Sequence, residues 1–237
     1  MSTISPTLKF ISYGNAFENL KAEAHQDWQA YTRHEFVKNL QDGSLSESAF
    51  VGYMKQDYVF LIHFSRAWAL AVVKSETIDE MTLASKTLDA LVNYEIQLHV
   101  KTCALLGVSE QDLFATEEHS ANLAYTRYVL DAGLQGDFLD LIVALTPCVL
   151  GYGEIGYNLK CDRLDSNPYQ DWIKTYGGAE YQNACLTVGN LLESSLTYRL
   201  GPNYAKSPRW ANLQKRFTVA TRLEVGFWDM GLSFGDR

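Results

Sequence analysis

The 237-residue chain lacks three features that define common functional classes: paired cysteines, clusters of basic residues and frequent prolines. Its four cysteines, Cys103, Cys148, Cys161 and Cys185, form no CxxC pair. This excludes the usual zinc and disulfide frameworks and predicts reduced thiols. Acids outnumber bases by 28 to 20, giving a formal net charge of −8, and no run of Lys and Arg could follow a phosphate backbone. We therefore expect no nucleic-acid partner.

Targeting and membrane-spanning segments are also missing from the sequence pattern. The N-terminus has no basic stretch followed by an apolar one, so it does not resemble a secretory signal. The longest apolar run, around residues 139–149, is shorter than the roughly 20 residues that a membrane-spanning helix needs. These absences predict a soluble protein of the cytoplasm with no membrane partner.

The five prolines and the scarcity of alternating β-branched residues favour helices over strands. Apolar residues recur at helical spacing along the whole chain, which predicts an all-α fold. We expect a single domain over residues 1–237, with residues 1–12 as an N-terminal extension. The predicted helices cover residues 15–39, 46–74, 77–106, 117–132, 136–161, 168–176, 179–200 and 207–232.

One apolar segment, residues 139–157, contains a cysteine directly after a proline. Pro147 has no N–H to donate to the preceding turn and tends to kink a helix. Cys148 and Tyr152 are four residues apart, so they share one helix face. Taken alone, the segment favours a core helix with a small buried cysteine, because free cysteine is among the most buried residue types.

Two carboxylates interrupt otherwise apolar helix faces. Asp57 falls within the i, i+3, i+4 stripe formed by Phe50, Tyr53, Met54, Leu61, Phe64 and Trp68, and Glu224 falls within a second stripe formed by Leu213, Phe217, Ala220, Phe227 and Gly231. Burial of an unpartnered carboxylate costs several kcal/mol, so each should have a partner or face a polar cavity. Together with Cys148 they favour a functional cavity, in which burial would raise the pKa of a carboxyl group.

A metal site is the competing interpretation. Glu95 and His99 are spaced i, i+4, and His63 lies on the helix that carries Asp57. Di-iron bundles usually use paired Glu-x-x-His motifs, and this sequence has none. The Glu95–His99 spacing is more typical of an exposed pair that supports a helix. Nothing in the sequence selects His25 or His34 as a haem ligand.

Tyrosine is abundant, with 14 residues. Tyr125, Tyr152 and Tyr176 could stack on a flat heteroaromatic ligand while their hydroxyls bond its nitrogens.

Four sequence blocks resemble one family. They are QDYVFLIHFSRAW at residues 56–68, TPCVLGYGEIG at 146–156, YQDWIKTYGG at 169–178 and TRLEVGFWDM at 221–230. In this order they are similar to the TenA family, the thiaminase II or aminopyrimidine aminohydrolase proteins.

The resemblance implies a haem-oxygenase-like helical bundle, assembled as a homotetramer, that uses no metal or organic cofactor. It implies hydrolysis of 4-amino-5-aminomethyl-2-methylpyrimidine, and of thiamin itself, in thiamin salvage. By the same resemblance Cys148 is the nucleophile and Glu224 the acid and base. Asp57 would hold the aminopyrimidine, with Tyr125, Tyr152 and Tyr176 as pocket tyrosines and Phe60 as an aromatic wall.

The chain departs from many relatives of this family at Val149 and Gly153, where bulky aromatics are usual. It also departs at Leu223, which has no hydroxyl where some relatives have a tyrosine. We expect a different, roomier wall there, so the sequence leaves the leaving group and the exact substrate open. Two alternatives stay open: a di-iron oxygenase of the same fold, and a pyrimidine-binding protein without catalysis.

Overall fold

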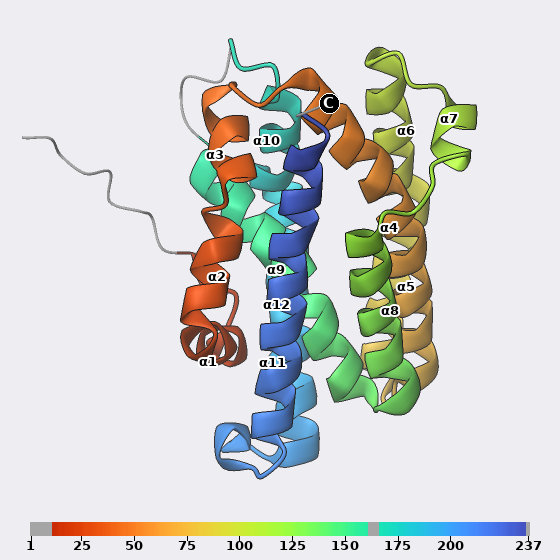
Figure 1. Cartoon of the computed structure of the whole chain (residues 1–237). Helices are drawn as coiled ribbons and strands as arrows, with labels where there is room; N and C mark the ends of the chain where they lie inside the picture. The colour runs from red at the N-terminus through yellow and green to blue at the C-terminus, as the bar shows by residue number, and fades with distance from the viewer. Residues whose placement is uncertain (1–10, 161–165, 236–237) are drawn as a thin grey trace, which may run out of the picture.

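The computed structural model describes residues 11–160 and 166–235, and within these ranges every regular element is helical (Figure 1). This confirms the predicted all-α class. The elements are α1 Asn15–Glu23, α2 His25–Thr32, α3 Glu35–Asp42, α4 Glu47–Lys74, α5 Ile78–Ala90, the π-helical turn η1 Leu91–Glu95, α6 Ile96–Leu105, α7 Glu110–Phe114, α8 Ser120–Gln135, α9 Phe138–Leu159, α10 Gln170–Gly177, α11 Ala179–Leu200, the 3-10 turn η2 Tyr204–Lys206 and α12 Trp210–Ser233.

Helices α9 and α12 organise the bundle. Helix α9 packs against α8, α10, α11 and α12, and α12 also packs against α2, α3, α4 and α8. Figure 1 shows α12 between α1–α3 on one side and α4–α8 on the other. Three helices that carry predicted site residues, α4, α9 and α12, therefore meet in one core.

Helix α9 is the centre of that core. Every residue from Phe138 to Pro147 is buried, and the helix continues without interruption through Pro147. Its 22 residues make it long and apolar enough to cross a membrane by length and composition, which the short apolar run in the sequence does not suggest. However, 89% of its most apolar stretch is buried inside the protein, as in the core helix of a globular domain.

Two predicted helices differ from the structure. Residues 15–39 form three helices, because the backbone leaves helical geometry at Ala24 (φ −97°, ψ 20°) and at Arg33 (φ −118°, ψ 24°). His34 then caps α3, accepting a hydrogen bond from the Phe36 N–H at its Nδ1. The predicted helix over 77–106 is interrupted by η1. Breaks of one or two residues, as at Ala24 and at Arg33–His34, leave the apolar period almost unchanged, so the sequence does not show them.

The N-terminal extension expected over residues 1–12 lies mainly outside the described residues. Tyr13, which follows it, is buried and donates a hydrogen bond from its hydroxyl to Gln182 Oε1 at 2.8 Å. The described chain is therefore fixed to the core from this residue onward.

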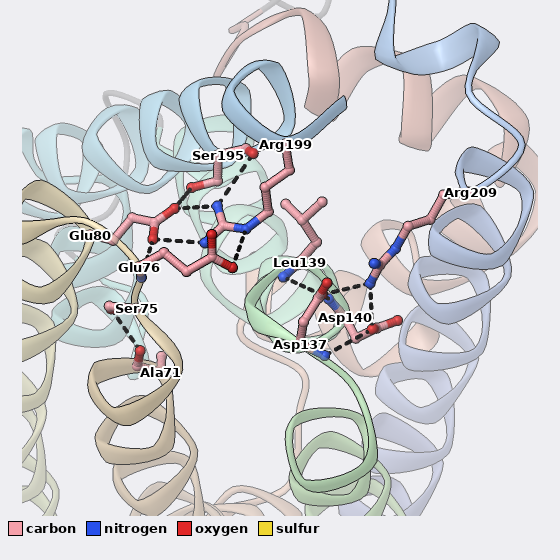
Figure 2. A network of polar contacts seen from close by, with 10 residues as sticks. All are labelled: Ala71, Ser75, Glu76, Glu80, Asp137, Leu139, Asp140, Ser195, Arg199 and Arg209. Carbon is pink, nitrogen blue, oxygen red and sulfur yellow. Dashed lines mark hydrogen bonds and ion pairs between the residues drawn. The ribbon is translucent and has the colours of Figure 1, made fainter. Parts of the chain in front are cut away.

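A polar network fixes the helices at one end of the bundle (Figure 2). Glu80 of α5 is buried, and it accepts hydrogen bonds from Arg199 Nη2 at 2.9 Å and from Ser195 Oγ at 2.8 Å. Burial alone would raise the pKa of Glu80, but the bonds to Arg199 and Ser195 and the Arg199 charge outweigh it, so this pKa is lowered. The network therefore holds an ionised carboxylate between α5 and α11.

A second part of the network caps the central helix. The Asp137 carboxylate accepts from the N–H groups of Leu139 and Asp140, and Asp140 in return accepts from the Asp137 N–H, which is a capping box. Arg209 Nη2 lies 2.6 Å from both carboxylates (Figure 2). These contacts join the N-terminus of α9 to the segment that begins α12.

Candidate active site

Asp57 is buried in α4, as its place in an apolar stripe predicts, and it has the partners that burial requires. Its Oδ2 lies 2.6 Å from His99 Nε2 and accepts from the Tyr53 hydroxyl at 3.1 Å. The side chains of Asp57 and His99 are each only 4% exposed. The Tyr53 hydroxyl in turn lies 3.3 Å from Trp172 Nε1 and 3.4 Å from the Tyr152 hydroxyl. Asp57 is thus anchored on one oxygen by two side chains.

The prediction that Glu95 and His99 form an exposed pair is wrong. His99 is buried, and Glu95 is only partly exposed and accepts from the Tyr176 hydroxyl at 3.3 Å. Burial raises the pKa of the Glu95 carboxyl, assisted by the charge of Asp57. Burial would lower the pKa of His99, but the hydrogen bond and charge of Asp57 outweigh it and raise this pKa. Both residues belong to the cluster around Asp57.

Glu224 of α12 is 1% exposed and accepts a 2.7 Å hydrogen bond at Oε1 from the Tyr125 hydroxyl. Burial raises the pKa of Glu224 to about 8, with a contribution from the charge of Asp57, against the lowering effect of the Tyr125 bond. A carboxyl group with this pKa is about nine-tenths protonated at pH 7. Glu224 can therefore give and take a proton near neutral pH.

Cys148 is partly buried in α9, between two anchored carbonyls. The Tyr31 hydroxyl donates to the Pro147 carbonyl at 3.5 Å, and the Tyr181 hydroxyl donates to the Val149 carbonyl at 3.2 Å. Burial raises the pKa of the Cys148 thiol well above its ordinary value, and the nearby charges of Glu224, Asp57 and Glu95 add to this. The thiol is therefore protonated at neutral pH in the absence of a ligand.

Aromatic rings connect these groups. Phe60 lies against Tyr125 and Phe227, with ring centroids 5.1 and 5.4 Å apart. Tyr152 lies 5.1 Å from Tyr176 and 5.8 Å from Trp172 by the same measure. The rings and hydrogen bonds join six of the seven residues predicted for the site: Asp57, Phe60, Tyr125, Tyr152, Tyr176 and Glu224. The seventh, Cys148, lies near enough to Glu224 and Asp57 for their charges to act on its thiol. The chemical role of each stays a prediction.

The three carboxyl groups share one property. In each, a single oxygen is held by described residues, namely Asp57 Oδ2, Glu95 Oε1 and Glu224 Oε1. The other oxygen has no hydrogen-bond partner among the described residues. A group with several N–H donors would satisfy these oxygens, and an amino-substituted nitrogen heterocycle carries such donors on a flat ring.

Six residues of the cluster were not predicted as site residues: Tyr31, Tyr53, Glu95, His99, Trp172 and Tyr181. Glu95 and His99 carried a usable signal, because their spacing places both on one face of a helix. Trp172 lies in the sequence block at residues 169–178 that carries the family resemblance, but no role was assigned to it. The sequence contains no comparable signal for the hydroxyls of Tyr31 and Tyr181.

The roomier wall expected at Gly153 is not found. A Cβ at this position would lie 2.5 Å from Cys185 Sγ and 2.8 Å from the Tyr13 hydroxyl oxygen. Neighbouring side chains therefore fill the space that a larger residue would occupy. Val149 is 8% exposed. Leu223 is partly buried and packs against the core.

The metal and haem candidates do not converge. His63 lies 3.0 Å from Arg66 Nη1 and 3.2 Å from Arg127 Nη1, away from the contacts that Glu95 and His99 make. His25 contacts Gln29, and His34 contacts Asp229. In the part of the chain that the structure describes, no group of three His, Cys, Asp or Glu side chains is arranged to hold a metal ion.

Comparison with known proteins gives consistent results. A sequence model described as the TENA/THI-4/PQQC family matches residues 21–233. The chain is 36% identical over 214 residues to a protein of Halalkalibacterium halodurans named aminopyrimidine aminohydrolase, covering 90% of this chain and 93% of the relative. It is 57% identical to the solved structure of a TenA family transcription regulator from Silicibacter sp. TM1040, with a TM-score of 0.91 and coverage of 93% and 98%.

The fold is also shared with a more distant structure. A domain of unknown function from Shewanella denitrificans, described as having a haem-oxygenase-like fold, superposes with a TM-score of 0.71 at 12% identity, covering 96% of this chain and 95% of that one. The predicted haem-oxygenase-like fold is therefore confirmed. With the family model matched over residues 21–233, the chain belongs to the TENA/THI-4/PQQC family, in agreement with the resemblance of its four sequence blocks.

Proposed function

We propose that the protein is a hydrolase of the aminopyrimidine aminohydrolase, or thiaminase II, type. It would convert 4-amino-5-aminomethyl-2-methylpyrimidine and water into the hydroxymethyl pyrimidine and ammonia, as a step of thiamin salvage, and would accept thiamin as a second substrate. One observation supports the proposal: the charges of three carboxyl groups, Asp57, Glu95 and Glu224, act on the Cys148 thiol, and each has one oxygen without a hydrogen-bond partner among the described residues. The family relationship to named aminohydrolases supports it.

Binding would use the charge and the rings of the cluster. Asp57 Oδ1 accepts a hydrogen bond from the amino group of the pyrimidine, since Oδ2 is already held by His99 and Tyr53. Phe60, Tyr125 and Tyr152 provide aromatic surface for the flat ring, and Tyr176 provides a hydroxyl next to Glu95. Enclosure by these rings excludes water from the reacting carbon.

In the first half of the reaction, the sulfur of Cys148 forms a bond to the ring carbon next to the aminomethyl-bearing carbon. The thiol proton moves to Glu224 while the proton of Glu224 moves to a ring nitrogen. Electrons of the ring, which the added sulfur has made electron-rich, then move toward the exocyclic methylene, and the exocyclic carbon–nitrogen bond breaks. The nitrogen leaves with the electron pair of that bond. Glu224 protonates it, so ammonia departs and a carboxylate remains.

In the second half, water adds to the exocyclic methylene and gives its proton to the Glu224 carboxylate. The carbon–sulfur bond then breaks, and the ring N–H proton returns to the sulfur, restoring the thiol and the aromatic ring. The cycle needs a carboxyl group that is protonated at the start and ionised midway. A pKa of about 8 suits Glu224 to this role.

Ammonia release from the purified protein and the aminomethyl pyrimidine tests the proposal. We expect turnover by the wild type and a loss of at least about 1,000-fold in Cys148→Ser, the scale seen when a covalent nucleophile is removed. Cys103→Ala, a buried cysteine of α6 outside the cluster, is the matched control and should keep its activity. Absence of wild-type turnover would refute the proposed hydrolase activity. Equal turnover by Cys148→Ser would refute a mechanism with Cys148 as the nucleophile.

Binding measured by calorimetry separates the enzyme from a pyrimidine-binding protein. Tight binding of the aminomethyl pyrimidine by a wild type that releases no ammonia would assign a binding role instead. Residence in the cytoplasm and a homotetrameric assembly are parts of the same proposal. Light scattering on a sizing column checks the assembly, which should have about four times the 26.7 kDa of one chain.

A further inference from the structure

We propose that His99 is a positioning residue, present as an imidazolium that fixes Oδ2 of Asp57, keeps this carboxylate anionic and leaves Oδ1 for the amino edge of a pyrimidine. This inference deepens the proposed function and rests on it for the identity of the ligand. His99 does not contact the reacting atoms. It acts through Asp57, to which it is joined by a 2.6 Å contact.

The hydrogen-bond geometry fixes where the protons of the imidazole lie. His99 Nδ1 is 3.1 Å from the backbone carbonyl of Glu95, and a carbonyl oxygen only accepts, so Nδ1 carries a proton. Nε2 faces Asp57 Oδ2, which also accepts from the Tyr53 hydroxyl. Because Oδ2 already accepts the Tyr53 proton, it is better placed as an ionised oxygen than as a protonated one, and the proton of the 2.6 Å contact then lies on Nε2.

The local charge balance gives the same assignment. Asp57 and His99 are both nearly fully buried, so an imidazolium and a carboxylate in contact cost less than either charge alone. The titratable groups on which the charge of Asp57 acts come from α4, η1, α6, α9, α10 and α12 and are otherwise neutral or acidic: Tyr53, Glu95, Cys103, Cys148, Tyr152, Tyr176 and Glu224. His99 is the cation in contact with Asp57.

The chain positions His99 with an unusual backbone element. The π-helical turn η1 ends at Glu95, and the Ile96 N–H that follows bonds to the Leu91 carbonyl. The Glu95 carbonyl accepts from His99, and the Glu95 carboxyl accepts from Tyr176 in α10. One residue therefore orients the imidazole with its backbone and contacts the far wall with its side chain. Such π-helical turns occur often at functional sites.

The protonation state is tested without any substrate. In protein labelled with ¹⁵N-histidine, the two ring nitrogens of His99 should both be protonated at pH 7 in the wild type, and Asp57→Asn should make the ring neutral. The exposed His25 is the internal reference, because it contacts only Gln29 among the hydrogen bonds of the described residues. A neutral His99 ring in the wild type at pH 7 would overturn the proposal.

The positioning role is tested by binding of the hydroxymethyl pyrimidine and by kinetics. We expect His99→Ala to raise Kd and KM by about 10- to 100-fold, the effect of losing one charge-assisted hydrogen bond, with a smaller change in kcat. His99→Gln should recover most of this loss, since its amide can donate to Oδ2. Both variants should change the pH profile of binding, because each removes the titrating imidazole from the contact with Asp57 Oδ2.

A structural role alone predicts a different pattern. If His99→Ala lowers thermal stability but leaves Kd, KM and the pH profile of binding unchanged, the proposal is wrong. His25→Gln is the matched control, and it should change none of these quantities. If the wild type neither binds nor converts the pyrimidine, the proposed function fails together with the ligand named here. The imidazolium would then still be confirmed or excluded by the nitrogen spectrum.

Discussion

Replacement of Glu224 by glutamine should change how the stability of the protein depends on pH. Glu224 is 1% exposed, and burial raises its pKa from 4.5 to about 8 in the folded state. The folded protein therefore holds a proton on this group over a pH range in which the unfolded chain has lost it. Glutamine has a similar shape, still accepts from Tyr125 at its Oε1, and cannot titrate.

The sign and size of the effect follow from linkage. A group whose pKa is raised on folding contributes stability that is fully present below its unfolded pKa and is lost as the pH rises through its folded pKa. One pKa unit corresponds to roughly 1.4 kcal/mol, so a rise from 4.5 to about 8 removes up to about 5 kcal/mol of unfolding free energy across this window. Glu224→Gln should lack this decline.

Urea denaturation at half-unit steps from pH 5 to pH 9 measures the difference. The free energy of unfolding of Glu224→Gln minus that of the wild type should rise by several kcal/mol over this range. Tyr125→Phe sharpens the test, because the Tyr125 bond lowers the pKa of Glu224, so its removal should move the decline to higher pH. Parallel wild-type and Glu224→Gln curves would refute the reasoning, since Glu224 would then titrate alike in both states.

Two further predictions concern the polar network at the end of the bundle and the packing at Gly153. Arg199→Met leaves Glu80 buried without its cation and should cost about 3–5 kcal/mol of unfolding free energy at pH 7, with less loss of stability below pH 5 than in the wild type. Denaturation at both pH values checks this, and a loss under about 1 kcal/mol would contradict it. Gly153→Ala places a Cβ 2.5 Å from Cys185 Sγ and should cost about 1–3 kcal/mol. Cys185→Ala should relieve part of this cost in a double-mutant cycle, whereas simple additivity would exclude the contact.

The sequence predicts the two inward carboxylates because each breaks a regular apolar stripe. Asp57 and Glu224 occupy positions where the i, i+3, i+4 pattern calls for an apolar side chain, and both are buried. The surrounding stripes are buried as well, so the period alone fixes which face of α4 and of α12 points inward. The partners of these carboxylates were not predictable, because His99 and Tyr125 come from helices whose packing the period does not determine.

The N-terminal helices and Gly153 show a second limit. The breaks at Ala24 and at Arg33–His34 are only one and two residues long, and the apolar period continues across them. Gly153 suggested an open wall, since a glycine adds no side chain of its own. The structure places Tyr13 and Cys185 in this space, and no local pattern connects either residue with Gly153.

The segment around η1 explains why the sequence assigned Glu95 and His99 to the wrong face. Tyr94 is 71% exposed and Leu98 is 43% exposed, whereas His99 is 3% exposed. At these three positions the usual orientation of an amphipathic helix is reversed, although Leu91 and Cys103 of the same segment face the core. Burial of apolar surface cannot favour this arrangement. The contacts of His99 with Asp57 and of Glu95 with Tyr176 must offset its cost, which is the situation expected where a fold gives up stability to position reactive groups.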